Sequence, residues 1–179
     1  MSASVDLIFQ RRSIRKFLPD SIEDEKIEMI LKAGMAAPSA MNMQPWEFIV
    51  ITAKEKKSQI RNALPFAKME APLIICVCGN SKNSRNLVFD RFWVQDCSAA
   101  TENILLAVVG LGLGGVWCGV HPIGSYVKKI SEILELPDHV KPLNVILIGY
   151  PAEKKEPRTQ FKPERVHWQS FAGKKDREG

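Results

Sequence analysis

The sequence lacks the patterns that mark a metal site or a disulfide framework. Among its 179 residues there are three histidines and four cysteines, with no CxxC pair. Cys118 and His121 are close in the chain and His139 and His167 are isolated, whereas a metal site needs ligands that converge at a recognisable spacing. We therefore predict no metal ion. The N-terminus also lacks the pattern of a signal peptide, so the cysteines favour a reducing, cytoplasmic location.

A membrane span is missing as well. One uncharged run, residues 104–120, is shorter than the ~20 apolar residues of a spanning helix, and five glycines interrupt it. We expect this run to be a buried helix that turns into a strand, and we predict no membrane partner.

The positive charge of the chain is not accompanied by a nucleic-acid motif. The formal net charge is +5, but the basic residues are spread over the chain and mixed with acids. This pattern favours an anionic ligand and solvated faces, so we predict no nucleic-acid partner.

Residues 110–115 match G-x-G-x-x-G, yet a helical pattern precedes them and a strand follows. That order is the reverse of a dinucleotide-binding fold, and we predict no Rossmann site.

The chain reads as one domain, residues 1–156, followed by an arm, residues 157–179. Apolar periodicity predicts helices near residues 5–9, 21–37, 54–64, 86–109 and 127–136, and strands at 46–52, 72–78, 114–120 and 144–150. Ser21 and Asp24 are expected to cap the second helix. The strand at 72–78 is apolar on both faces, which places it inside the sheet. The arm carries several large apolar residues, so we expect it to pack on this subunit or on a partner.

Two short segments hold the candidate binding residues. Residues 11–17 (RRSIRKF) combine three arginines with a serine, and guanidinium groups bind phosphate oxygens bidentately. Residues 38–46 (PSAMNMQPW) offer a hydroxyl, two side-chain amides and a tryptophan, which suit the edge of a flat heterocycle. Taken singly, the first is equally well a solvated helix end, and the second a helix stop before a core strand. Their occurrence together with Arg158 favours a phosphorylated, ring-bearing cofactor.

With these residues the sequence resembles the FMN-dependent nitroreductase family. Its shorter members have an R-R-S-I-R-x-[FY] start, a P-S-x-x-N-x-Q-P-W loop, and a W-x-G segment after a helix of small residues. The motifs occur here in the same order, from Arg11 to about Trp168. The resemblance implies an α+β fold with a mixed, mostly antiparallel central sheet flanked by helices. It also implies an intertwined homodimer with two FMN sites at the interface, in which the C-terminal arm reaches across the partner.

The resemblance also implies cofactor contacts for particular residues. The residues expected to hold the phosphate, ribityl chain and pyrimidine edge of FMN are Arg11, Arg12, Ser13 and Arg15, with Arg158 completing the phosphate clamp. The residues of a loop along the flavin, expected from the other subunit, are Pro38, Ser39, Asn42 and Gln44. The residues of the strand end that faces the ring are Trp117, Cys118, Gly119 and Val120. Two positions depart from the family pattern: Val120, where relatives often have glycine or alanine, and Glu156, where some larger members have a basic residue.

The activity that the resemblance implies is transfer of hydride from NADH or NADPH, through flavin N5, to a flat electron-poor acceptor such as a nitroaromatic or a quinone. The flavin carries the chemistry, so no catalytic side chain is needed, and Arg15 is expected to support the reduced flavin electrostatically. A non-catalytic FMN-binding or storage protein remains an alternative. So does a specialised relative, such as a reductive dehalogenase or a flavin-fragmenting enzyme, although the short connection between residues 64 and 72 leaves little room for a lid. The sequence identifies neither the acceptor nor the preferred nicotinamide.

Overall fold

The computed structural model describes residues 3–171 and 173 and has a four-stranded sheet at its centre. The strands are β1 (Trp46–Ile51), β2 (Leu73–Asn80), β3 (Gly114–Gly119) and β4 (Val140–Gly149). Their order across the sheet is β1-β2-β4-β3, and each neighbouring pair is antiparallel. A parallel pairing exists as an isolated bridge between Ser13 and Gly115. The α+β prediction is confirmed, and β2 lies inside the sheet as expected.

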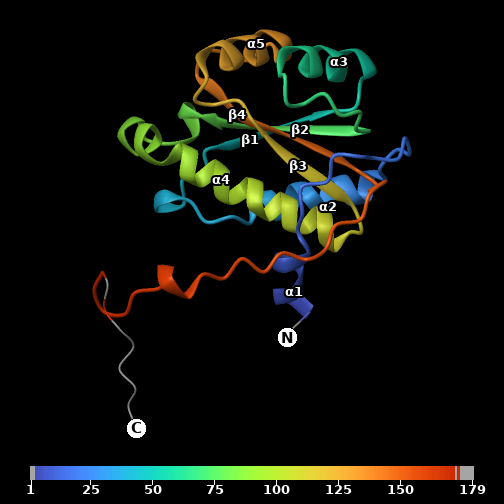
Figure 1. Cartoon of the computed structure of the whole chain (residues 1–179). Helices are drawn as coiled ribbons and strands as arrows, with labels where there is room; N and C mark the ends of the chain where they lie inside the picture. The colour runs from blue at the N-terminus through green and yellow to red at the C-terminus, as the bar shows by residue number, and fades with distance from the viewer. Residues whose placement is uncertain (1–2, 172, 174–179) are drawn as a thin grey trace.

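Helices cover both faces of the sheet. They are α1 (Ala3–Gln10), α2 (Asp24–Met35), α3 (Lys54–Ala63), α4 (Asn86–Gly110) and α5 (Gly124–Leu134), with short 3-10 turns η1 (Ala40–Asn42), η2 (Ser81–Asn83) and η3 (Pro163–Arg165). Figure 1 shows α2 and α4 on one face of the sheet and α3 and α5 on the other. None of the described helices is long and apolar enough to cross a bilayer.

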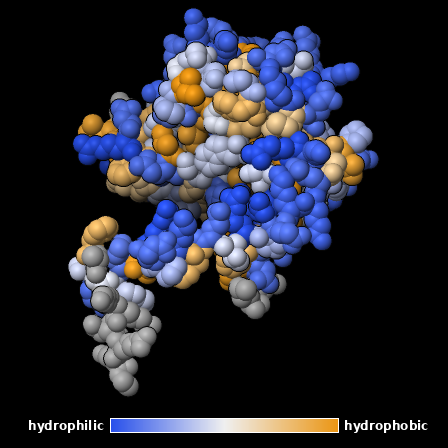
Figure 2. All heavy atoms as spheres, in the orientation of Figure 1, coloured by the Kyte–Doolittle hydropathy of each residue, from blue (hydrophilic) through white to orange (hydrophobic). Residues whose placement is uncertain are grey.

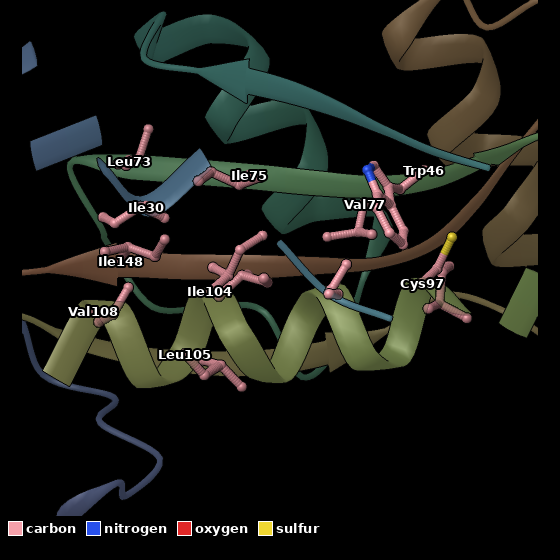
Figure 3. Close-up of a cluster of buried hydrophobic side chains, with 14 of the residues drawn as sticks. Ile30, Trp46, Leu73, Ile75, Val77, Cys97, Ile104, Leu105, Val108 and Ile148 are labelled. Atoms are coloured by element: carbon pink, nitrogen blue, oxygen red, sulfur yellow. The ribbon is translucent and has the colours of Figure 1, made fainter. Parts of the chain in front are cut away.

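The alternating side chains of β2 enter two separate cores. Leu73, Ile75 and Val77 pack with Ile104 of α4 and Ile30 of α2, the cluster shown in Figure 3. The intervening residues of β2 pack against α3 and α5 on the opposite face. Because every residue of β2 from Leu73 to Gly79 is buried, its apolar run needs no polar alternation. Burial of both faces of β2 holds in place the sheet to which the candidate site is attached.

Two local predictions were wrong. β4 begins at Val140, four residues before the predicted start, because Pro142 lies opposite Cys78 where the register of β2 shifts. A proline has no N–H to donate, and an irregularity in the partner strand accommodates it. The N-cap of α2 is Glu23, without a side-chain capping bond, so the expected capping pair of Ser21 and Asp24 does not form.

A polar cluster joins the start of α2 to the residue after β4. The Tyr150 hydroxyl lies 2.7 Å from the Glu23 carboxylate, to which it donates, and 2.6 Å from Lys26 Nζ, from which it accepts. Lys26 Nζ also lies 3.1 Å from Glu23 Oε2. The hydrogen bond from Tyr150 is the largest cause that lowers the pKa of Glu23 from 4.5 to about 2. The carboxylate therefore favours the folded state whenever it is ionised.

Glu23→Gln should lose stability that depends on pH. Because the pKa of Glu23 is lower in the folded chain, its contribution is present in full above pH 4.5, declines as the pH falls, and is absent below about 2. We expect the difference in unfolding free energy between wild type and Glu23→Gln to shrink over this window in urea titrations. The control is Glu25→Gln, on the exposed side of the same helix. A difference that stays constant from pH 6 to pH 2.5 would contradict this assignment.

The C-terminal segment stands away from the body of the subunit. In Figure 1 it leaves the sheet, passes α1 and continues as an extended chain. Phe161 and Phe171 are 78% and 89% exposed, and Figure 2 shows apolar side chains along this segment. Residues 172 and 174–179 of the predicted arm lie outside the described residues. Packing of the arm on a partner stays a prediction, and the exposure of these rings is consistent with it.

Candidate functional site

The first component of the site is the arginine segment, residues 11–17, which runs beside the start of β3. The Ile14 N–H donates to the Gly115 carbonyl at 3.1 Å, and Ser13 forms the parallel bridge to Gly115. The Ile14 side chain is buried against Gly114, where an added Cβ would lie 2.8 Å from the Ile14 Cβ. Glycine at position 114 therefore permits the close approach that anchors the segment to the sheet.

The second component is the strap, residues 150–158, which runs antiparallel to the arginine segment. The Leu18 N–H donates to Tyr150 O at 2.8 Å, and the Ala152 N–H donates to Lys16 O at 2.9 Å. Further along, the Arg158 N–H donates to Phe9 O at 2.9 Å. The strap thus brings Arg158 to the end of α1, next to the arginines that follow this helix.

The arginines of the segment differ in their partners. Arg11 Nε lies 2.9 Å from the Glu102 carboxylate on α4. Arg12 Nη1 donates to the Glu156 carbonyl of the strap, whereas Arg12 Nε is buried with no partner among the described residues. The Arg15 side chain is exposed, and its backbone N–H donates to Glu153 Oε1 at 2.5 Å. A buried cationic N–H without an acceptor is costly, so Arg12 points to an anionic ligand that completes the site.

The third component is the open edge of β3. The Gly115 carbonyl faces away from β4, because it accepts from Ile14. Residues two apart in an antiparallel strand turn their N–H and C=O to the same side, so Trp117 and Gly119 also face this edge. An added Cβ at Gly119 would meet no atom within 4 Å, and Trp117 is 36% exposed. The end of β3 therefore offers backbone donors beside free space.

The side chains of Cys118 and Val120 point away from this edge, into the core that lies between the sheet and α5. The Cys118 Sγ lies 3.7 Å from the Phe66 carbonyl. Burial raises the pKa of the Cys118 thiol to about 11, and the nearby charge of Arg15 acts in the lowering direction. Cys118 is consequently a neutral thiol at physiological pH. The bridge from Ser13 to Gly115 sets the arginine segment along β3.

The loop at residues 38–44 lies elsewhere on the subunit. The Ser39 Oγ accepts from the Gln44 N–H at 2.9 Å, and Asp96 of α4 accepts from the Ala40 N–H at 2.9 Å. Met41, Asn42 and Gln44 have positive φ, which makes the loop a compact turn. Among the described residues, no hydrogen bond or ion pair joins this loop to the arginine segment. One subunit therefore brings together the predicted contacts at 11–15, 117–120 and 158, and leaves those at 38–44 apart.

No group of three or more His, Cys, Asp or Glu among residues 3–171 and 173 could hold a metal ion. The four cysteines are free thiols, all of them buried.

Comparison with known proteins decides the family. The Nitroreductase family model matches residues 8–65 and 64–150, which cover most of the chain and all four strands. The chain belongs to the Nitroreductase family. A relative from Archaeoglobus fulgidus, whose name refers to NADH dehydrogenase and NAD(P)H nitroreductase, is 44% identical over 172 residues, or 93% of this chain and 98% of the relative.

Solved nitroreductase structures have the same fold. An FMN-dependent nitroreductase from Clostridium difficile superposes with a TM-score of 0.84 at 31% identity, covering 93% of this chain and 99% of the other. A nitroreductase structure from Desulfovibrio desulfuricans, determined in complex with FMN, superposes with a TM-score of 0.79 at 29% identity, covering 96% and 99%. The predicted α+β nitroreductase fold is therefore confirmed.

Sequence reasoning missed two residues of the candidate site of this nitroreductase. Glu153 and Lys155 of the strap contact the arginine segment directly. Both lie in a charged, proline-punctuated stretch that resembles a solvated surface. A weak signal was available, because the stretch directly precedes Arg158, which was itself a phosphate candidate.

Proposed function

We propose that this nitroreductase binds FMN at the arginine segment and transfers electrons from NADH or NADPH to a flat, electron-poor acceptor such as a nitroaromatic or a quinone, in the cytoplasm. When bound, FMN supplies the hydride chemistry, which the protein side chains do not need to perform. The observation that carries the proposal is the Nε of Arg12, which is buried without a partner among the described residues, one position before the bridge from Ser13 to Gly115 of β3. The FMN-dependent relative and the FMN complex named above support it.

The residues of the candidate site fit FMN. Its phosphate needs cationic donors: Arg12 contacts the strap at Glu156, Arg158 ends the strap beside α1, and Arg11 follows that helix. Its ring needs a flat, open surface with a backbone donor at one edge, which Gly119 provides. Arg15, exposed and close to Cys118, would hold the pyrimidine edge and place positive charge where reduction adds negative charge.

A second copy of the chain would complete the site. The loop at 38–44 carries Ser39, Asn42 and Gln44 but does not reach the arginine segment of its own subunit. The exposed apolar side chains of the arm, with Met41 at 65% exposed, need a partner surface to leave water. We propose a homodimer in which this loop lies along the flavin of the other subunit and the arm crosses the partner.

Removing the apolar rings of the arm should weaken this dimer. Phe161 and Phe171 are the most exposed phenylalanines, and each would bury a large apolar area on a partner. We expect Phe161→Ser/Phe171→Ser to raise the dimer dissociation constant by at least tenfold in sedimentation velocity experiments. Phe66→Ser, a half-exposed phenylalanine before β2, is the matched control. An unchanged dimer in the double variant would place the interface elsewhere.

The absorption spectrum of the purified protein tests the activity. We expect a flavin band that bleaches anaerobically when NADH or NADPH is added and returns when a quinone or nitroaromatic follows. A band that persists under excess NADH and NADPH would instead indicate a flavin-binding or storage protein. Absence of bound flavin at saturating FMN would overturn the proposal.

A further inference from the structure

The backbone of the arginine segment is held from outside by two side chains of the strap. The Glu153 carboxylate accepts from the Arg15 N–H at 2.5 Å and from the Lys16 N–H at 3.3 Å. Lys155 Nζ donates to the Ser13 carbonyl at 2.6 Å. Glu153 and Lys155 also pair with each other, with 3.2 Å between Oε1 and Nζ. One ion pair therefore contacts three consecutive peptide units of the segment.

This arrangement separates the backbone of the segment from its side chains. On the sheet side the Ile14 N–H is taken by Gly115, and on the strap side Ala152 donates to Lys16 O. The peptide groups thus have partners that do not involve the arginine side chains. The guanidinium groups are then presented to a ligand by a backbone that is already fixed, which reduces the entropy lost on binding.

The burial of the two side chains fits a specific role in this contact. The Glu153 and Lys155 side chains are 21% and 25% exposed. Lys154, between them, is exposed and has no hydrogen bond or ion pair among the described contacts. The hydrogen bond from the Arg15 N–H is the largest cause that lowers the pKa of Glu153, so the carboxylate is charged at neutral pH. Bonds from peptide groups to a charged acceptor are stronger than those between neutral groups.

We infer that Glu153 and Lys155 are positioning residues that set the geometry of residues 13–16, and through it the affinity for FMN. They act through Ser13 and Arg15 and need not touch the cofactor themselves. The inference rests on the proposed function, since FMN is the ligand whose affinity it concerns. It goes beyond that function by assigning the control of affinity to an ion pair outside the predicted contact residues.

The test is a titration of the full-length protein with FMN, followed by quenching of flavin fluorescence. We expect Glu153→Ala to raise the Kd for FMN by about tenfold or more, the loss expected for one charge-assisted hydrogen bond. Glu153→Gln should give an intermediate Kd, because the amide oxygen still accepts from the Arg15 N–H. Lys155→Met should raise the Kd in the same way, and Lys154→Met, one residue away on the exposed side, should leave it unchanged.

A second measurement separates positioning from general stability. We expect the thermal midpoint of the FMN-free Glu153→Ala variant to stay within about 4 °C of wild type, which corresponds to roughly 1–2 kcal/mol for a chain of this size. A wild-type Kd in Glu153→Ala would overturn the inference and leave the proposed function standing. The inference would also be overturned if Lys154→Met raised the Kd for FMN as much as Lys155→Met does. Wild-type protein that binds no FMN would overturn the proposed function and this inference together.

Discussion

Replacing Arg12 by Met is expected to raise the Kd for FMN by on the order of 100-fold, since each hydrogen bond to a charged group contributes about 1.5–3 kcal/mol. Arg12 is held by its Nη1 bond to the Glu156 carbonyl, and its Nε is buried without an acceptor in the described part of the chain. A phosphate oxygen would supply that acceptor and could engage more than one N–H of the fork. Methionine fills the space of the arginine stem as far as Nε but offers no donor. The readout is the same fluorescence titration, made alongside apparent kcat at saturating FMN.

Two further variants make the result specific to Arg12. Arg12→Lys keeps the charge but lacks the planar fork, so its Kd should lie between those of wild type and Arg12→Met. Arg61→Met removes a cation of the same type from α3, where Arg61 pairs with Glu70 at 2.7 Å, and should bind FMN as wild type does. If Arg12→Met retained wild-type affinity, the orphaned Nε would not be a cofactor contact, and the phosphate would have to lie elsewhere.

The sequence predicted those parts of the fold whose signal is local. The apolar run of β2 reflects burial on both faces, and the long helical pattern before Gly110 corresponds to α4. The early start of β4 could not be read, because Pro142 is tolerated only through the register shift opposite Cys78. That compensation lies in another strand and leaves no mark near the proline.

The same distinction between local and long-range features applies to the candidate site. The arginine segment could be predicted from residue types alone, because three guanidinium groups in five residues are a chemical pattern. The role of Glu153 could not, because it depends on a contact between positions 138 residues apart. The separation of the loop at 38–44 from the arginine segment was expected only through the family resemblance, which assigned this loop to the other subunit, because the residue pattern itself does not say which copy of the chain supplies a residue. Residue patterns within one segment could be predicted from the sequence, whereas contacts between segments far apart in the chain could not.

Gly114→Ala is expected to destabilise the fold and to disturb the cofactor site through one displaced side chain. An added Cβ at this position would lie 2.8 Å from Ile14 Cβ and 2.9 Å from both of its γ carbons. Overpacking of this kind costs about 1–3 kcal/mol. Because Ile14 is buried and its N–H donates to Gly115, the strain should move the arginine segment away from β3. We expect lower unfolding free energy in urea and a Kd for FMN that rises with it.

Gly119→Ala, on the same strand, tests whether the FMN ring lies against β3 without straining the FMN-free fold. An added Cβ there meets nothing within 4 Å, so the unfolding free energy of the FMN-free protein should change by less than about 0.5 kcal/mol. If the ring of FMN lies against this residue, the Kd should nevertheless rise.

For Gly114→Ala, combination with Ile14→Ala removes the two γ carbons, so the double variant should lose less stability than the sum of the single losses. Strict additivity would mean that the γ carbons of Ile14 do not receive the strain, which would then fall on the Ile14 Cβ, 2.8 Å from the added Cβ and retained in Ile14→Ala.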